Sequence, residues 1–218
     1  MSYDFLLKSV IMGSSGAGKT SLADALAGRE QTEGYIPTIG ADFRSYLATF
    51  RGLHRVKIHI WDTGGDHSFR GIIESYCRGV SCVVLVYDVT SRASFQNIYV
   101  SYRDAMRAND CIGHGHPLFL IGNKKDLSHR RTVPKEEGER LARNLNAHFL
   151  ETCATCQLNT NHLRDVMIEC VFREIIDRDV CCKGVNHATT HVRQPPGTKD
   201  TYSLLGRKDK PHWCCTMQ

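Results

Sequence analysis

The segment GSSGAGKT, residues 13–20, contains the first group of residues whose types and spacing could do chemistry. It fits the phosphate-binding pattern G-x-x-x-x-G-K-[ST], follows an apolar run and opens a helical pattern. Its glycines let backbone N–H groups point at a β-phosphate, Lys19 reaches β- and γ-phosphate oxygens, and the Thr20 hydroxyl is a ligand for Mg²⁺. The expected nucleotide contacts are Ser15, Gly16, Ala17, Gly18, Lys19, Thr20 and Ser21.

A second motif, NKKD at residues 123–126, indicates which base the site selects. It ends an apolar strand pattern, and sheets of this class bind ligands at that edge. The Asp126 carboxylate can accept from both N1–H and the 2-amino group of guanine, and the Lys124 stem can lie along the base. Adenine lacks that donor pair, so binding it would leave a buried charge unpaired. The two motifs predict GTP/GDP as ligand, with Mg²⁺.

Apolar strand patterns alternate with helical patterns along the chain. We expect strands at residues 5–13, 42–50, 55–62, 82–88, 117–126 and 148–151, and helices at 18–28, 94–108, 134–145 and 159–178. The strands 42–50 and 55–62 predict an antiparallel hairpin, and Ser94 is the expected cap of its helix. This order predicts an α/β fold: a mostly parallel, doubly wound sheet with right-handed crossovers and helices on both faces.

The motifs together resemble those of Ras-superfamily small GTPases, closest to the Rab family, over residues 5–178. The segments that carry the likeness are YIPTIGADF, WDTGGDHSF, SYCRGV, YDVTSRASF, NKKD and ETCAT. The resemblance implies a P-loop small-GTPase domain at residues 1–179, with six strands, mostly parallel, and one antiparallel edge hairpin.

The resemblance also implies roles for individual residues. Thr38 would close over the γ-phosphate and Mg²⁺, Asp62 would hold Mg²⁺ through water, and the Gly65 amide would contact the γ-phosphate. The metal set is then Thr20, Thr38 and Asp62, and the catalytic set is Lys19, Thr38, Gly65 and Asp66. The base set is Asn123, Lys124, Asp126, Cys153, Ala154 and Thr155, with the Ala154 N–H directed at the guanine O6.

An aromatic set matches the effector-binding face of Rab proteins. Its members here are Phe43, Trp61 and Tyr76. Ordinary strand and helix packing explains the same three residues equally well, and the two interpretations are compatible.

Four positions depart from the family pattern. Asp66 stands where a glutamine usually orients the attacking water, and Gly64 replaces the usual alanine, which adds backbone freedom. Thr155 replaces a lysine that packs by the base. Gln31 stands where an aromatic residue often stacks on guanine, so that either Tyr35 substitutes or the nucleotide is held less tightly.

The chain has 10 cysteines, and we expect them to be mostly reduced thiols in a cytosolic protein, since no signal peptide or membrane-spanning run is evident. Cys153 and Cys156 form a C-x-x-C pair, but a zinc or redox site favours a second pair or a helix-start setting. His114 and His116 are spaced like metal ligands, and an exposed loop is the simpler explanation.

Residues 180–218 predict a flexible tail that is rich in polar residues, glycine and proline. The tail holds six basic and two acidic residues, hence +4 of the net +5, which is too mild to indicate nucleic acid. Its end, CCTMQ, fits a prenylation box at Cys215 with a second site at Cys214. Two lipids, or one lipid with basic residues, anchor a protein stably to the cytosolic face of an intracellular membrane.

Three functions remain open from the sequence. The first is a Rab-like switch in vesicle traffic with slow GTP hydrolysis. Its implied partners are an exchange factor, a GTPase-activating protein, effectors and a prenyl-protein carrier. The second is a scaffold that holds nucleotide with little hydrolysis, which Asp66 and Gln31 favour. The third is a P-loop ATPase or kinase, against which Asn123 and Asp126 argue strongly.

Overall fold

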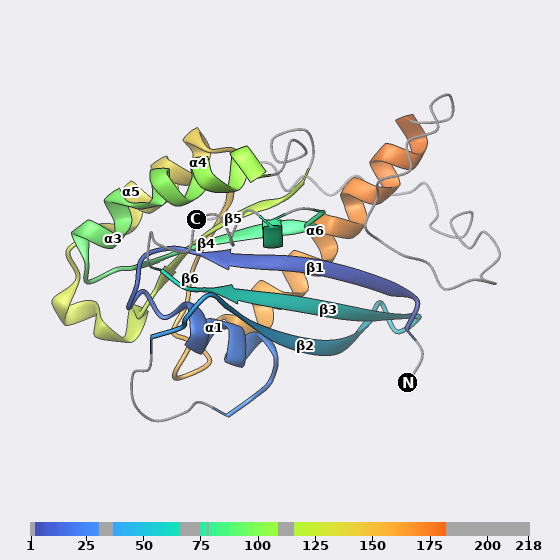
Figure 1. Ribbon diagram of the computed structural model, residues 1–218, viewed down its shortest axis with the longest axis horizontal. Helices are drawn as coiled ribbons and strands as arrows, with labels where there is room; N and C mark the ends of the chain where they lie inside the picture. The colour runs from blue at the N-terminus through green and yellow to red at the C-terminus, as the bar shows by residue number, and fades with distance from the viewer. Residues whose placement is uncertain (1–2, 31–36, 66–74, 78, 109–115, 182–218) are drawn as a thin grey trace.

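The computed structural model describes residues 3–30, 37–65, 75–77, 79–108 and 116–181, and of residues 174–181 the backbone alone. Six strands form one sheet in the order β2-β3-β1-β4-β5-β6 (Figure 1). The strands are β1 Phe5–Met12, β2 Ala41–Phe50, β3 His54–Thr63, β4 Cys82–Asp88, β5 Leu118–Asn123 and β6 His148–Glu151. Only the β2–β3 pair is antiparallel, so the expected sheet with one edge hairpin is confirmed.

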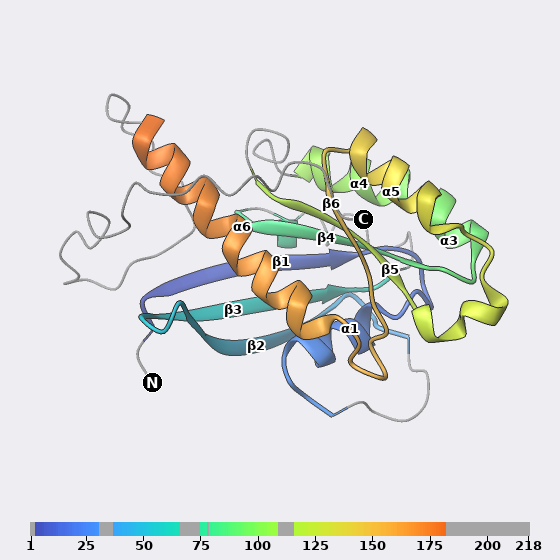
Figure 2. The same ribbon diagram turned by 180° about the vertical axis from the view of Figure 1, so that it is seen from behind.

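Helices cover both faces of the sheet (Figures 1 and 2). They are α1 Lys19–Leu26, α3 Arg92–Gln96, α4 Ile98–Ala108, the 3-10 helix η2 Lys125–Arg130, α5 Lys135–Asn144 and α6 Thr160–Cys181. The fully buried strand β4 shows why both faces are apolar. Val84 and Val86 pack with residues of α1 and α6, whereas Val83 and Leu85 pack with residues of α4 and α5. Among the described residues, no helix is long and apolar enough to cross a bilayer.

The strand register brings polar residues to one edge of the sheet. Ile11 pairs with Asp62 across β1 and β3, and Asp88 pairs with Asn123 across β4 and β5. Each of these residues lies at or beside the carboxyl end of its strand. Because parallel strands end at the same edge, residues far apart in sequence meet there, beside the loop between β1 and α1.

Two local predictions were wrong. The single helix expected at residues 94–108 is two helices, α3 and α4, with Asn97 between them. The cap of the first is Ser91, in an extended conformation, whose hydroxyl accepts from the Ser94 N–H at 3.3 Å. Ser94 lies inside the helix, where its hydroxyl donates to the Asp88 carbonyl at 3.2 Å and thereby ties α3 to the end of β4. An N-cap residue whose side chain accepts from the helix typically has an extended backbone, as Ser91 does.

Candidate functional site

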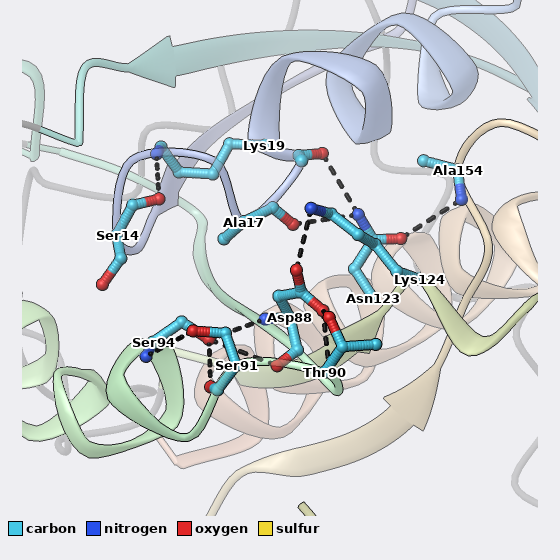
Figure 3. Close-up of polar contacts among 11 residues, drawn as sticks. Ser14, Ala17, Lys19, Asp88, Thr90, Ser91, Ser94, Asn123, Lys124 and Ala154 are labelled. Carbon is cyan, nitrogen blue, oxygen red and sulfur yellow. Dashed lines mark hydrogen bonds and ion pairs between the residues drawn. The ribbon is translucent and has the colours of Figure 1, made fainter. Parts of the chain in front are cut away.

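The segment at residues 13–20 runs from the end of β1 into the first turn of α1, as the sequence predicts. Gly18 is the N-cap of α1 in the left-handed conformation, which costs glycine little. Lys19 is the first helical residue, and its side chain bends back along the loop. Its ammonium donates to the Ser14 carbonyl at 2.8 Å (Figure 3). Burial lowers the pKa of Lys19 to about 8, against the opposing effect of the Asp62 charge. A buried ammonium at the mouth of this loop favours an anionic ligand.

Three oxygen-bearing side chains from separate segments meet beside the loop. The Thr20 hydroxyl donates to Asp62 Oδ2 at 2.6 Å and lies 3.0 Å from the Thr38 hydroxyl. The Thr38 hydroxyl lies 3.4 Å from the same carboxylate oxygen. The predicted metal set is therefore assembled by α1, the start of the segment before β2, and β3.

This oxygen cluster fits a small divalent cation. Asp62 is fully buried, and within the described residues its Oδ1 has no hydrogen-bond partner. Burial raises the pKa of Asp62, while the Thr20 hydroxyl and the charges of Arg44 and Lys19 oppose that rise. A buried carboxylate with an unpaired oxygen and two neighbouring hydroxyls is a set of hard ligands of the kind Mg²⁺ prefers.

The segment after β3 folds back against both the loop and Thr38. The Gly64 N–H donates to the Gly40 carbonyl at 2.7 Å. A Cβ on Gly64 would lie 2.6 Å from the Thr38 carbonyl oxygen, and one on Gly65 would lie 2.2 Å from the Ser15 nitrogen. Gly64 has no positive φ, so the departure from alanine serves close approach rather than the added backbone freedom that the sequence suggested. Gly65 lies directly against the phosphate-binding loop.

Asn123 links the other half of the site to the same loop. Its amide Nδ2 donates to the carbonyls of Ala17 and Gly18 at 3.1 and 3.3 Å (Figure 3). Its Oδ1 accepts from the Ala154 N–H at 3.2 Å and the Thr152 hydroxyl at 3.3 Å. The buried side chain thus joins the end of β5, the phosphate-binding loop and the segment after β6.

Lys124 adopts the left-handed conformation at the start of η2. Its ammonium pairs with Asp88 at 2.8 Å (Figure 3), which directs the side-chain stem across the space beside Gly18. Asp88 also accepts from the backbone N–H and the hydroxyl of Thr90, both at 2.7 Å. Burial would raise the pKa of Asp88, but the bonds from Lys124 and Thr90 together lower it.

Asp126 is exposed in the first turn of η2, where its carboxylate is accessible to a ligand. Its carboxylate lies within 4.8 Å of the sulfur atoms of Cys153 and Cys156. These two cysteines, expected as thiols, are joined by a disulfide. Thr155, between them, is exposed.

The aromatic set is contiguous. The ring centroids of Phe43 and Trp61 lie 5.0 Å apart, and those of Trp61 and Tyr76 lie 4.7 Å apart. Phe43 is 39% exposed, whereas Trp61 and Tyr76 are half-buried against the core. The packing interpretation is therefore confirmed, and the role of the three rings in effector binding stays a prediction.

Some expected residues lie outside the described part of the chain. They are Asp66, Gln31, Tyr35, His114, Cys214 and Cys215. His116, expected to be exposed, is half-buried at a short β-bridge before β5.

The sequence analysis missed a buried ion-pair cluster under the oxygen cluster. Arg44 on β2 is 4% exposed; its Nε donates to Asp24 of α1, and its Nη1 lies 3.1 Å from Asp42 and 3.8 Å from Asp62. Ion pairing with Asp24 raises the pKa of Arg44 despite burial, which opposes it. The available signal was Asp24, an acid inside the apolar helix segment LADAL.

The fold and the site together define a P-loop protein of the α/β class, with a set of polar groups gathered at the carboxyl edge of the sheet. The profile of the Ras family matches residues 8–175, and the chain belongs to this family. It is 34% identical over 196 residues to the Ras-related protein Rab-13 of Bos taurus, with 90% of each chain covered.

Two further relatives support membership of the same family. The chain is 36% identical to Rab-13 of Rattus norvegicus over 77% of this chain and 83% of that protein. It is 35% identical to Rab-26 of Homo sapiens over 82% of this chain and 67% of that protein. The expected likeness to a Ras-superfamily small GTPase close to Rab is confirmed.

Proposed function

We propose that this chain is a membrane-anchored molecular switch of vesicle traffic, which binds GTP and GDP with Mg²⁺ and hydrolyses GTP slowly. The observation that carries this proposal is the meeting of Thr20, Thr38 and Asp62 oxygens within 3.4 Å, from three separate segments. Such a cluster makes the position of Thr38 depend on what the phosphate-binding loop holds.

Each half of the site has a distinct task in this proposal. Residues 15–21 surround the phosphates, with Lys19 neutralising the β- and γ-oxygens, while Thr20, Thr38 and Asp62 hold Mg²⁺. Asp126 accepts from the guanine edge, and the Ala154 N–H donates to O6. When bound, Mg²⁺ offsets phosphate charge. Loss of the γ-phosphate removes the contacts of Thr38 and Gly65, which releases the surface that includes Phe43, Trp61 and Tyr76.

Slow hydrolysis follows from Asp66. A glutamine both donates to the transition-state oxygens and accepts from the attacking water, whereas an ionised aspartate only accepts and is shorter. An aspartate about 5 Å from the γ-phosphate would be repelled by roughly 3 kcal/mol per unit charge at an effective dielectric of 20. A carboxylate that turned away from the phosphate would leave the water unoriented. The exchange factor, the GTPase-activating protein, effectors and a prenyl-protein carrier are the partners of such a switch.

The deciding experiment is single-turnover hydrolysis by the wild type and by Asp66→Gln with saturating Mg²⁺. We expect both to hold GTP, ATP to compete poorly, and the wild type to be slower. A wild type as fast as the variant would refute the role given to Asp66. No measurable turnover in either protein, with GTP still bound, would favour the scaffold, which Asp66 and Gln31 support.

The anchor is tested separately. We expect native protein to carry lipid on Cys214, Cys215 or both, and the double Cys→Ser variant to leave the membrane fraction. An unmodified terminus at Gln218 in protein from native cells would remove the support for anchoring.

A further inference from the structure

A disulfide closes a small ring on the segment that follows β6. It joins Cys153 and Cys156, whose Cα atoms are 5.5 Å apart at a sequence separation of 3. The ring contains Ala154 and Thr155. Its two sulfur atoms also lie within 4.8 Å of the Asp126 carboxylate. The ring therefore contains Ala154 and lies close to Asp126, the two groups to which the proposed guanine site assigns contact with the base.

The hydrogen bonds of the segment show what the ring holds in place. The Ala154 N–H donates to Asn123 Oδ1 at 3.2 Å, and the Cys153 N–H donates to the Leu158 carbonyl at 3.2 Å. The Cys156 N–H points at the Cys153 sulfur at 3.1 Å. In the family pattern E-T-S-A-K, this chain has cysteine in place of serine and threonine in place of lysine. One end of the covalent link, Cys153, thus stands at the serine position of the pattern, and the other end, Cys156, directly follows the pattern.

The two cysteines differ in access. Cys156 is exposed, whereas Cys153 is fully buried. The other cysteines whose side chains the structure describes, Cys77, Cys82 and Cys170, are buried thiols. A soluble disulfide can therefore reach Cys156 first, after which Cys153 lies within bonding distance to displace the added thiol.

We propose that Cys153 and Cys156 are a thiol–disulfide pair whose oxidation slows the release of guanine nucleotide. The reaction is an exchange with a low-molecular-weight disulfide. The Cys156 thiolate attacks it, forming a mixed disulfide and releasing one thiol, and the Cys153 thiolate then displaces the second thiol. Two protein thiols are oxidised, one soluble disulfide is reduced to two thiols, and the two protons remain with those thiols.

The consequence for the nucleotide rests on the proposed function. With the ring closed, the Ala154 N–H and the neighbourhood of Asp126 have fewer conformations available, so that the base pocket opens less often. With the ring reduced, the segment from Thr152 to Leu158 is held by its hydrogen bonds alone. Closing so short a loop should slow GDP release by roughly threefold to tenfold.

The first measurement is of the pair itself and does not depend on nucleotide. The protein is equilibrated with reduced and oxidised glutathione, its thiols are alkylated, and it is digested with trypsin. Residues 144–164 form one tryptic peptide that contains both cysteines, so oxidation is read as the loss of two alkyl groups from that peptide. We expect oxidation in Cys170→Ser as in the wild type, and none of the intramolecular product in Cys156→Ser. Two alkylated thiols under oxidising glutathione would overturn the proposal.

The second measurement is the release of a fluorescent GDP from oxidised and reduced protein. We expect slower release from the oxidised wild type and from oxidised Cys170→Ser, with no dependence on oxidation in Cys156→Ser, which removes only an exposed sulfur. Equal rates in the oxidised and reduced wild type would overturn the proposal while leaving the guanine site intact. A protein that forms the disulfide but binds no guanine nucleotide would instead refute the proposed function, and with it the effect on release.

Discussion

Gly64→Ala tests whether the switch segment closes on Thr38 as the geometry indicates. The added Cβ would lie 2.6 Å from the Thr38 carbonyl oxygen, whereas ordinary contact begins at 3.4 Å, so one segment must move by about 0.8 Å. The movement strains the bond from the Gly64 N–H to the Gly40 carbonyl, which is 2.7 Å long. Overpacking of this kind costs about 1–3 kcal/mol. The variant carries the alanine that the family pattern has at this position.

The cost should fall on the state in which Thr38 is closed. We therefore expect Gly64→Ala to weaken binding of a non-hydrolysable GTP analogue by about fivefold to 150-fold, the range set by that energy. GDP binding is the internal control and should change little, because GDP lacks the phosphate that Thr38 covers in the proposed switch. Both affinities can be measured by competition against a fluorescent nucleotide. A variant that binds the analogue as well as the wild type does would show that this close approach is absent from the GTP-bound form.

Three further changes probe the framework of the site. Asp24→Leu removes the buried carboxylate that pairs with the Nε of Arg44, and it should lower the free energy of unfolding by about 3–5 kcal/mol in urea titrations. The double change of Asp24 and Arg44 to leucine should recover most of that loss. Partial burial and two neighbouring lysines lower the pKa of His59 from 6.5. Between that lowered pKa and about pH 6.5 the unfolded chain therefore binds more protons than the folded chain, so the free energy of unfolding should fall as the pH falls through this range. The fall should be less steep in His59→Gln. Asn123→Ala should speed GDP release by roughly tenfold or more in stopped-flow assays.

The sheet was predictable because the strands appear in the sequence as short apolar or alternating runs. In β4 every residue is buried, and alternate residues face opposite layers of helices, which is why the run CVVLVYD reads as a central strand. The antiparallel edge was predictable from the short connection between β2 and β3. The break at Asn97 was not predictable, since the helical period continues through it. The first of the two helices is tied through Ser94 to the end of β4, a tertiary contact that the local pattern does not indicate.

Parts of the candidate site could likewise be predicted from the sequence, and other parts could not. The phosphate-binding loop and Asn123 could be placed from their motifs, because glycines and an asparagine at a strand end have few other uses in this pattern. The pairing of Asp24 with Arg44 could not be predicted, since neither sequence segment indicates which residue the other would contact. The close approach at Gly64 could not be predicted from the sequence either. The atom that an alanine Cβ would meet there is the carbonyl oxygen of Thr38, which is distant in sequence.

Asn123 links the phosphate-binding loop to the disulfide ring. One of its polar atoms bonds the phosphate-binding loop, and the other accepts from Ala154 inside the disulfide ring. A change in the ring can therefore reach the loop through two hydrogen bonds and one rigid, buried side chain. This connection predicts a non-additive result. If Asn123 transmits the constraint, oxidation of Cys153 and Cys156 should alter GDP release in the wild type but much less in Asn123→Ala. An undiminished oxidation effect in that variant would place the constraint at the base alone, through Asp126.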